Sequence, residues 1–225
     1  MYAKYIKRIL DFILSLIALI VLSPVLLVVA ILVRIKLGSP IIFKQQRPGK
    51  DEKIFTLYKF RTMTDKKDEN GNLLPDSERL TKFGKVLRST SLDELPELVN
   101  ILKGDMSIVG PRPLLIRDML FMTDEQRKRH TVRQGLTGLA QINGRNNITW
   151  EEKINYDLNY VENISFINDV KIILKTVIKV FKREDTQTDG MQTAEDLGDY
   201  LLRTKKITQK EYNEKMRKCK NEYKI

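Results

Sequence analysis

The longest apolar run of the chain lies near its N-terminus, at residues 12–33. These 22 residues carry no charge and, as a straight helix, would measure roughly 33 Å, enough to span a bilayer. Ser23 and Pro24 interrupt the run at its middle, and a proline inside a helix costs about 3 kcal/mol because a backbone hydrogen bond is lost. Ser23 can soften the break by bonding a freed carbonyl. The pattern therefore predicts two helical arms joined at Ser23-Pro24.

Basic residues flank this run on both sides. Lys4, Lys7 and Arg8 precede it, and Arg34 and Lys36 follow it. Positive residues favour the cytoplasmic side of a membrane, so a spanning helix should have an asymmetry that this run lacks. We therefore favour a re-entrant helical hairpin with both ends on the cytoplasmic face. A spanning helix with a proline kink is the alternative.

Beyond residue 37 the pattern changes to short strands and amphipathic helices. Residues 41–43 and 54–63 read as strands, with a turn at Arg47-Pro48-Gly49 between them. In the second strand a period of two puts Lys59 and Arg61 on one face. That face is either solvated or a pair of cations directed at a phosphate.

Helical spacing of apolar residues predicts further helices at 78–88, 149–162 and 165–183, and one that starts near Asp93 and ends before Gly104. The helix at 165–183 has basic residues opposite its apolar stripe. We expect that stripe to pack in the core, and lying on a membrane surface is the alternative. The stripe consists of Val170, Ile173, Leu174, Val177, Val180 and Phe181, and the basic face of Lys171, Lys175, Lys179 and Lys182.

These patterns divide the chain into a membrane hairpin with its flanks (1–37), a domain of ordinary size (38–184) and a polar, partly helical tail (185–225). The expected fold class is α+β, mostly helical, with short strands and amphipathic interfacial helices. The single cysteine, Cys219, excludes an internal disulfide. With His130 as the single histidine, the composition argues against zinc and favours a hard cation held by carboxylates.

The net charge of +11 is concentrated in the first 183 residues, which carry 31 Lys/Arg against 20 Asp/Glu. A basic body beside a membrane anchor suggests anionic headgroups or phosphate-bearing substrates. Nucleic acid would suit the same charge, but the chain has no helix-turn-helix, zinc-finger or RNA-binding signature. We therefore expect no nucleic-acid partner.

Asp93 and Glu94 precede Pro96, which is tolerated only in the first turn of a helix. The pair therefore falls at a helix N-terminus. It could cap the helix, with Asp93 as N-cap or with Ser91 and Glu94 as a capping box. It could also be chemical, because the helix dipole favours ionised carboxylates. An ionised aspartate is a competent nucleophile, and a neighbouring glutamate can hold Mg²⁺.

Two further stretches carry candidate phosphate contacts. Arg112 lies between two prolines, which stiffen the backbone and lower the entropic cost of fixing a guanidinium on a phosphate. Residues 135–145 have three glycines and the amides Gln141 and Asn143 around a short apolar run. This composition suggests a tight loop that contacts a ligand through its backbone, with Arg145 as a further phosphate or sugar contact.

Together, these residues resemble the bacterial sugar transferases known as monotopic phosphoglycosyl transferases, over about residues 1–183. Among the small members, the chain is similar to the Campylobacter-type enzyme that starts N-linked glycan assembly by transferring N,N'-diacetylbacillosamine phosphate. The motifs that carry the resemblance occur in one order: KFRTM from Lys59, SLDELP from Ser91, KGDM from Lys103, GPRP from Gly110 and GLAQINGR from Gly138.

The resemblance implies a reaction in which a UDP-sugar and polyprenol (undecaprenyl) phosphate give polyprenol diphosphate sugar and UMP. It implies that Asp93 is the nucleophile that forms a phosphosugar-enzyme intermediate, with Glu94 beside it as the Mg²⁺ ligand. It also implies a re-entrant anchor at the bacterial inner membrane, with the catalytic domain on its cytoplasmic face. Because both substrates are phosphate anions, the basic residues should converge on the dyad of Asp93 and Glu94. These basic residues are Lys59, Arg61, Arg88, Arg112 and Arg145.

Two alternatives remain open. The same chemistry could transfer a hexose phosphate for a capsule or exopolysaccharide, and a non-enzymatic basic membrane adaptor would bind anionic lipid without turnover. The family usually has proline where this chain has Gln134, which predicts a less rigid loop. The tail is a partner-binding element, a homodimer element or a solvated extension.

Overall fold

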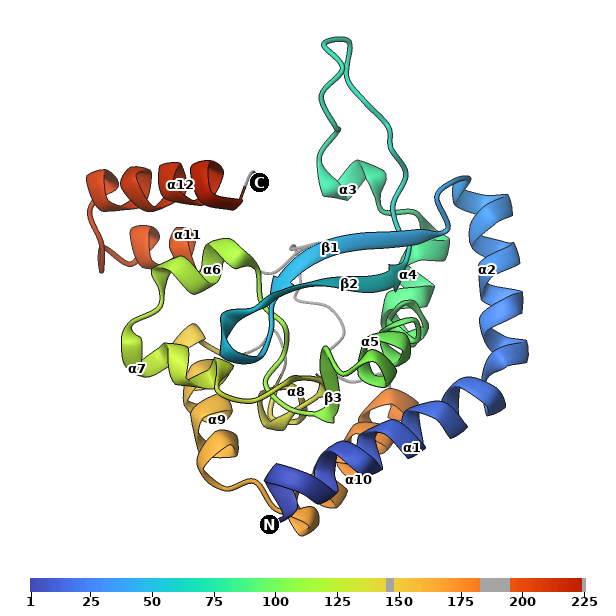
Figure 1. Ribbon diagram of the computed structural model, residues 1–225. Coiled ribbons are helices and arrows are strands. Elements are labelled where there is room, and N and C mark those ends of the chain that lie inside the picture. The colour runs from blue at the N-terminus through green and yellow to red at the C-terminus, as the bar shows by residue number, and fades with distance from the viewer. Residues whose placement is uncertain (145–147, 183–194, 224–225) are drawn as a thin grey trace.

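The computed structural model describes residues 1–144, 148–182 and 195–223. It has an α+β fold, mostly helical with short strands, as the sequence predicts (Figure 1). Short 3-10 turns lie at Lys50–Glu52, Leu92–Glu94 and Lys128–His130, and a π-helical turn at Tyr2–Ile6. The strands are β1 (Ile42–Pro48), β2 (Ile54–Phe60), β3 (Met106–Val109) and β4 (Gln134–Thr137). The helices are α1 (Lys7–Val21), α2 (Ser23–Leu37), α3 (Asp76–Arg79), α4 (Lys82–Ser89), α5 (Glu97–Lys103), α6 (Ile116–Phe121), α7 (Asp124–Arg127), α8 (Leu139–Ile142), α9 (Trp150–Glu162), α10 (Phe166–Lys182), α11 (Leu197–Arg203) and α12 (Gln209–Tyr223).

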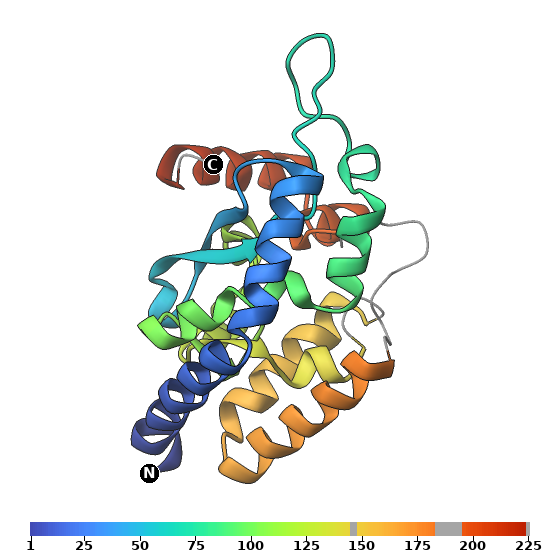
Figure 2. The ribbon, with the colours of Figure 1, turned by 90° about the vertical axis from the view of Figure 1, so that its right-hand side faces the viewer.

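The N-terminal apolar run forms the two helices α1 and α2, which break at Leu22 (Figure 2). The Ser23 hydroxyl donates to the Ile20 carbonyl at 2.7 Å, as the predicted compensation for the proline requires. Within the described residues no helix alone has the length and hydropathy to cross a bilayer. The segments Tyr2–Val21 and Ser23–Leu37 meet that criterion only as a pair, bent by 63°.

One side of this helix pair packs on the rest of the fold. Val29 and Val33 of α2 are buried against Phe60 of β2. In α1 the buried Asp11 accepts hydrogen bonds from the Ser107 hydroxyl at 2.7 Å and from the Ile108 amide at 3.0 Å. The helix pair is therefore attached to the rest of the fold by both apolar and polar contacts, and its outer side remains exposed.

Two small sheets form the centre. β1 and β2 pair antiparallel, with Ile42 opposite Phe60 and Pro48 opposite Ile54. The turn predicted at residues 47–49 is therefore partly wrong, because β1 continues through Pro48 and the chain reverses at residues 49–53. β3 and β4 pair in parallel through a crossover that contains α6 and α7. These four-residue strands are too short for an alternating pattern to reveal them.

The helix predicted at 78–88 is two helices, α3 and α4. Leu80 between them has extended backbone and forms a β-bridge with Met63. Thr81 then caps α4, since its side chain accepts from the Gly84 amide at 3.0 Å. The pairing with Met63 is a long-range contact, which explains why the local helical spacing missed the break.

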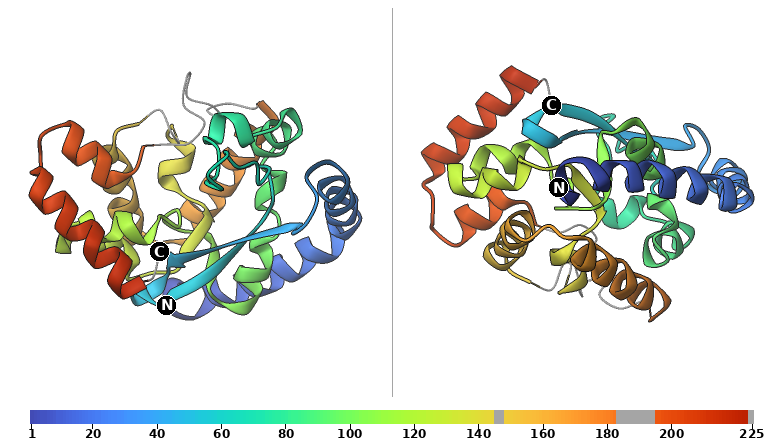
Figure 3. Two further views of the ribbon diagram at one scale, coloured as in Figure 1. Left: turned by 90° about the horizontal axis from the view of Figure 1, so that it is seen from above. Right: turned by 60° about the horizontal axis from the view of Figure 1, so that its bottom comes forward.

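α10 has the predicted length, but its stripe is not a core stripe. Val170, Leu174 and Val177 are exposed, whereas Ile172 is buried, and Thr176 bonds Thr137. The expectation of core packing is therefore wrong for the exposed part of that stripe. Figure 3 brings forward the side of the molecule on which α1 and α10 lie.

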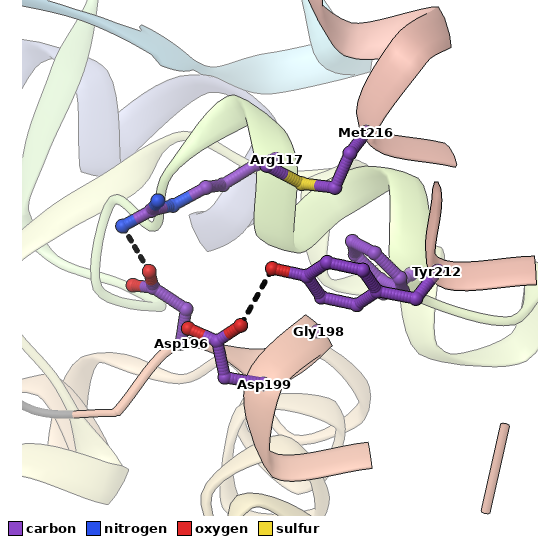
Figure 4. Close-up of a pocket in the computed structure, with 7 residues that line it drawn as sticks. Arg117, Asp196, Gly198, Asp199, Tyr212 and Met216 are labelled. Atoms are coloured by element: carbon purple, nitrogen blue, oxygen red, sulfur yellow. Dashed lines mark hydrogen bonds and ion pairs between the residues drawn. The ribbon is translucent and has the colours of Figure 1, made fainter. Parts of the chain in front are cut away.

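The tail packs on α6. Leu197 of α11 is buried in a cluster with Phe121 of α6. Figure 4 shows two polar contacts at this junction: the Tyr212 hydroxyl donates to Asp199 at 2.7 Å, and Arg117 pairs with Asp196. The described part of the tail is thus a folded element on the side of the domain away from α1, α2 and α10, rather than a solvated extension.

Candidate functional site

The Asp93–Glu94 pair lies in a 3-10 turn that precedes α5. Ser91 has a left-handed backbone (φ 56°), a conformation that non-glycine residues rarely adopt and that often marks functional turns. Pro96 then precedes α5, which starts at Glu97 rather than near Asp93. Neither capping interpretation holds, because no side-chain cap is present at either helix start. The two carboxylates are consequently available for other contacts.

Glu94 collects two cations on one oxygen. Lys59 Nζ of β2 lies 2.8 Å from Glu94 Oε1, and Arg112 Nη2 lies 2.9 Å from the same atom. Lys59 Nζ is also 3.0 Å from Oε1 of Glu97, in the first turn of α5. The fold therefore brings together four residues from parts of the sequence that are far apart: Lys59, Glu94, Glu97 and Arg112.

These contacts push the two carboxyl groups of the dyad in opposite directions. Burial favours the neutral form of both. At Glu94, however, Lys59 and Arg112 overcome burial and hold the pKa far below its usual range. At Asp93, burial and the charge of Glu94 raise the pKa to about 6. Near neutral pH, Asp93 is thus an ionised but destabilised carboxylate.

The Asp93 carboxylate has no hydrogen bond or ion pair with any described residue, although its residue is only 8% exposed. Arg88 is close enough to lower its pKa, together with Lys59 and Arg112. Arg88 Nε donates to the Thr62 hydroxyl at 3.1 Å, just after β2. Asp93 is therefore surrounded by cations that do not bond it directly, which leaves its oxygens accessible to a ligand.

Arg61 does not join this cluster. Its Nε donates to the Met63 carbonyl at 2.8 Å, Nη1 donates to the Ser39 carbonyl at 2.7 Å, and Nη2 pairs with Asp65. The prediction that Arg61 converges on the dyad is therefore wrong. Arg61 instead connects the chain after β2 to the segment before β1. The shared face of Lys59 and Arg61 ends with β2, because residues beyond Phe60 leave the strand.

The predicted glycine-rich loop packs closely on a neighbouring segment of the chain. A Cβ on Gly138 would lie 2.1 Å from the Gly110 carbonyl oxygen, so the loop needs glycine to approach its neighbour. Gln141 donates to the Leu136 carbonyl at 3.0 Å, and Asn143 donates to the Leu139 carbonyl at 2.8 Å. Both amides thus stabilise their own loop, and Arg145 lies outside the described residues.

Gln134 stands where the family usually has proline, and its side chain bonds the backbone of the preceding residues. It is fully buried, and its amide nitrogen donates to the Arg129 carbonyl at 3.3 Å and the Val132 carbonyl at 3.2 Å. A proline side chain could make neither bond, and the lower rigidity expected of this loop stays a prediction.

The sequence interpretation missed two residues near the dyad. Glu97 is 3% exposed, and burial followed by the Glu94 charge raises its pKa to about 7, against the opposing effect of Lys59. Its position three residues after Glu94 would have been a usable signal. Arg47 lies near Arg112, and burial and that neighbouring cation lower its pKa to about 10.

The carboxylates near Asp93 suit a Mg²⁺ ion that also has substrate and water ligands, rather than a metal ion enclosed by protein ligands alone. Within the described residues no group of three or more His, Cys, Asp or Glu side chains is arranged around a common point. Mg²⁺ commonly uses one or two carboxylates together with substrate phosphates and waters. Asp93 offers unpartnered oxygens, and the second oxygen of Glu94 has no partner among the described residues. Asp93 and Glu94 therefore suit an ion shared with a phosphorylated substrate.

Comparison with known proteins gives a consistent result. The model of the bacterial sugar transferase family matches residues 2–183. The chain is 52% identical over 190 residues to the uncharacterized sugar transferase EpsL of Bacillus subtilis, which covers 84% of this chain and 94% of that protein.

Two longer relatives have more specific names. The chain is 44% identical over 185 residues to a UDP-glucose:undecaprenyl-phosphate glucose-1-phosphate transferase of Klebsiella pneumoniae. It is 35% identical over 199 residues to the undecaprenyl-phosphate galactose phosphotransferase of Salmonella typhimurium. These matches cover 78% and 81% of this chain but only 40% and 42% of the relatives. The match to the family model ends at residue 183, near the start of the tail.

Proposed function

Because this chain belongs to the bacterial sugar transferase family, we propose that it transfers a sugar 1-phosphate from a UDP-sugar to undecaprenyl phosphate and releases UMP. The observation that carries the proposal is the contrast within the dyad. Among the described residues Asp93 has no hydrogen-bond or ion-pair partner, whereas Glu94 beside it is paired with Lys59 and Arg112. A free, ionisable carboxylate among cations is suited to attack a phosphate that carries negative charge.

The proposed reaction has two transfers. The Asp93 carboxylate oxygen attacks the phosphorus attached to the sugar, the bond from that phosphorus to the bridging oxygen breaks, and UMP leaves. A phosphate oxygen of undecaprenyl phosphate then attacks the same phosphorus, which forms the diphosphate and restores the Asp93 carboxylate. Two displacements at one phosphorus need no other reactant.

The surrounding cations have a defined task in these steps. The negative charge of the diphosphate must be balanced at the moment of transfer, and positioned cations are effective at this in a partly buried site. Arg112 is 41% exposed, so its guanidinium can reach a phosphate, and the charge of Arg88 lies close enough to Asp93 to act on the same phosphate. Mg²⁺, when bound at Asp93 and Glu94, would supply further charge neutralisation of the phosphates.

The exposed apolar side chains favour action at a membrane. Most of them lie on α1, α2 and α10, which Figure 1 places along the bottom and right of the molecule, and such a concentration of exposed apolar side chains marks a membrane or protein contact. We propose that α1 and α2 form a re-entrant anchor and that α10 lies on the cytoplasmic surface. The exposed residues are Ile9, Phe12, Ile13, Leu14, Leu16, Ile17, Ile20 and Val21 of α1, Val25, Leu27, Val28, Ile31, Leu32 and Ile35 of α2, and Phe166, Ile167, Val170, Leu174, Val177 and Ile178 of α10.

Leu174→Asp tests the membrane contact of α10. Leu174 is 59% exposed, so the variant should fold normally, but a charge in the headgroup region should weaken binding to vesicles of anionic phospholipid by about tenfold. Leu73→Asp is the matched control: Leu73 is 52% exposed in the loop that projects from the opposite side in Figure 1. Equal vesicle co-sedimentation of both variants and the wild type would contradict the assignment.

A UMP-release assay over a panel of UDP-sugars, with undecaprenyl phosphate and Mg²⁺, tests the function itself. The panel should include UDP-glucose and UDP-galactose, the sugars in the names of the two relatives, and UDP-N,N'-diacetylbacillosamine, the donor implied by the Campylobacter-type resemblance. We expect at least one donor to give UMP release, and we expect multiple turnovers only when the lipid acceptor is present. Salt-sensitive binding to anionic vesicles without UMP release from any donor would instead support the membrane adaptor.

A further inference from the structure

Arg129 is a fully buried cation whose partner lies on another element. Its side chain is 0% exposed. Its Nε and Nη2 both donate to Oδ2 of Asp157, at 3.0 and 2.8 Å, and Asp157 in α9 is itself buried. Replacing such a pair by apolar residues is often neutral for stability. Its presence therefore calls for another explanation, and the remaining contacts of Arg129 supply one.

One of those contacts is to the backbone of a site residue. Nη2 of Arg129 donates to the carbonyl of Arg112 at 2.6 Å. Because Arg112 is followed by a proline, the peptide after it has no N–H that could tether the loop. The preceding carbonyl, of Pro111, accepts from the Gly135 amide at 2.8 Å. Within the described residues, the bond from Arg129 is thus the backbone hydrogen bond nearest to the Arg112 side chain.

Among the described residues, Asp157 is the one carboxylate that contacts Arg129. Its Nη1 lies 3.2 Å from Nε2 of His130, and since a guanidinium cannot accept a hydrogen bond, this nitrogen must be the acceptor. Burial and the charge of Arg129 lower the pKa of His130 to about 3, so the imidazole is neutral. Asp157 is therefore the carboxylate that balances Arg129 and sets the plane of its guanidinium.

We propose that Arg129 and Asp157 are a positioning pair that fixes the backbone of Arg112 and thereby aims its guanidinium at the phosphate-transfer site. The inference rests on the proposed function in one respect, namely that Arg112 contacts the substrate. Arg112 Nη2 lies 2.9 Å from Glu94 Oε1, so the loop already holds its head group beside the dyad. A displacement of about 1 Å at a reacting centre can reduce turnover by about 100-fold.

A double-mutant cycle tests this role. Arg129→Lys keeps the charge but cannot bond both Asp157 and the Arg112 carbonyl in the geometry of a guanidinium. With Arg112 present, we expect Arg129→Lys to lower kcat/KM for UMP release by 10- to 100-fold, an estimate based on the cost of misplacement. In the Arg112→Ala background the same substitution should lower it by less than about threefold, because there is no guanidinium left to misplace.

Arg133→Lys is the matched control. Arg133 also donates to a backbone carbonyl, that of Gly104 at 2.8 Å, but it has no contact with Arg112. Its substitution should leave kcat/KM within about twofold in both backgrounds. Equal fold-losses for Arg129→Lys with and without Arg112 would overturn the proposal, since a merely structural role would act in both.

Two additions keep the outcomes decisive. Should Arg129→Lys fail to melt cooperatively, Asp157→Asn takes its place in the cycle with the same expectation, because it removes the group that orients Arg129. The wild type, the two single variants and the double variant are also titrated with UDP, so that coupling is measured where turnover of Arg112→Ala is below detection. A wild type that releases no UMP contradicts the proposed function, whereas an active wild type with additive variants contradicts only the positioning role.

Discussion

Replacement of Asp93 by asparagine is expected to reduce UMP release by at least about 10⁴-fold, the order seen when a nucleophile is removed from an enzyme. Asparagine keeps the shape of the side chain but cannot attack phosphorus as an anion. In the wild type, turnover should also fall as the pH drops below about 6, where Asp93 becomes protonated. UMP release at saturating donor, measured between pH 5 and pH 9, checks both statements.

The same substitution should stabilise the protein. Folding raises the pKa of Asp93 from 3.8 to about 6, so the folded state holds this proton more tightly than the unfolded state. The cost of ionising Asp93 is absent below about pH 4, grows as the pH rises, and is complete above about pH 6. Asp93→Asn removes that cost and should raise the free energy of unfolding at pH 8 by up to about 3 kcal/mol.

Asp51→Asn is a suitable control for Asp93→Asn. Asp51 is exposed in a turn with φ 53°, a backbone conformation that asparagine tolerates. It should change neither UMP release nor stability. Appreciable turnover by Asp93→Asn would rule out the nucleophile, and a lower stability would rule out the strained carboxylate.

Replacement of Glu94 by glutamine should be the second most damaging change, and it should have the opposite effect on stability. We expect a loss of UMP release of about 10³-fold, because Lys59 and Arg112 lose the carboxylate that positions them and the site loses a Mg²⁺ ligand. Breaking a buried ion pair by removing one partner typically costs about 3–5 kcal/mol. Both the kinetics and the thermal midpoint are measured at pH 8.

The sign of the Glu94 effect follows from its lowered pKa. Its stabilisation is fully present above the unfolded value of about 4.5 and is lost as the pH falls below it. The difference between the wild type and Glu94→Gln should therefore shrink in acid. Glu214→Gln, on the exposed surface of α12, provides a control that should be neutral at every pH. Equal thermal midpoints for Asp93→Asn and Glu94→Gln at pH 8 would contradict the contrast within the dyad.

The features that could be predicted from the sequence depend on local signals. The break at Ser23-Pro24 follows from the geometry of proline, and the lengths of α9 and α10 follow from their helical spacing. The resemblance also indicated Asp93, Glu94 and the basic residues from several short motifs in a fixed order. None of these inferences needed knowledge of long-range contacts.

The features that were missed depend on contacts between distant residues. Helical spacing shows that α10 has an apolar stripe but cannot show whether protein or lipid covers it. Arg61 left the predicted cluster because the Ser39 carbonyl, 22 residues earlier, takes one of its donors. The pairing of Arg129 with Asp157, 28 residues later, has no local signature at all.

The start of α5 illustrates how local and distant effects compete. A serine, an aspartate and a proline in close succession are typical of a capped helix. The chain instead adopts a left-handed conformation at Ser91 and a 3-10 turn through Glu94, so that Glu94 reaches Lys59 and Arg112. Ion pairs with β2 and with the proline-bracketed loop accompany this departure from the expected helix start.

The proposal that Asp93 forms a covalent intermediate is tested most directly by the covalent state of Asp93 during turnover. The protein is incubated with Mg²⁺ and the UDP-sugar that the panel identifies as donor, without lipid acceptor, and is then digested and analysed by mass spectrometry. We expect about one equivalent of UMP per protein and a mass increase of one sugar phosphate on the peptide that contains Asp93. Addition of undecaprenyl phosphate should then remove this sugar phosphate. UMP that appears only when the acceptor is present, with an unmodified Asp93 peptide throughout, would contradict the proposal.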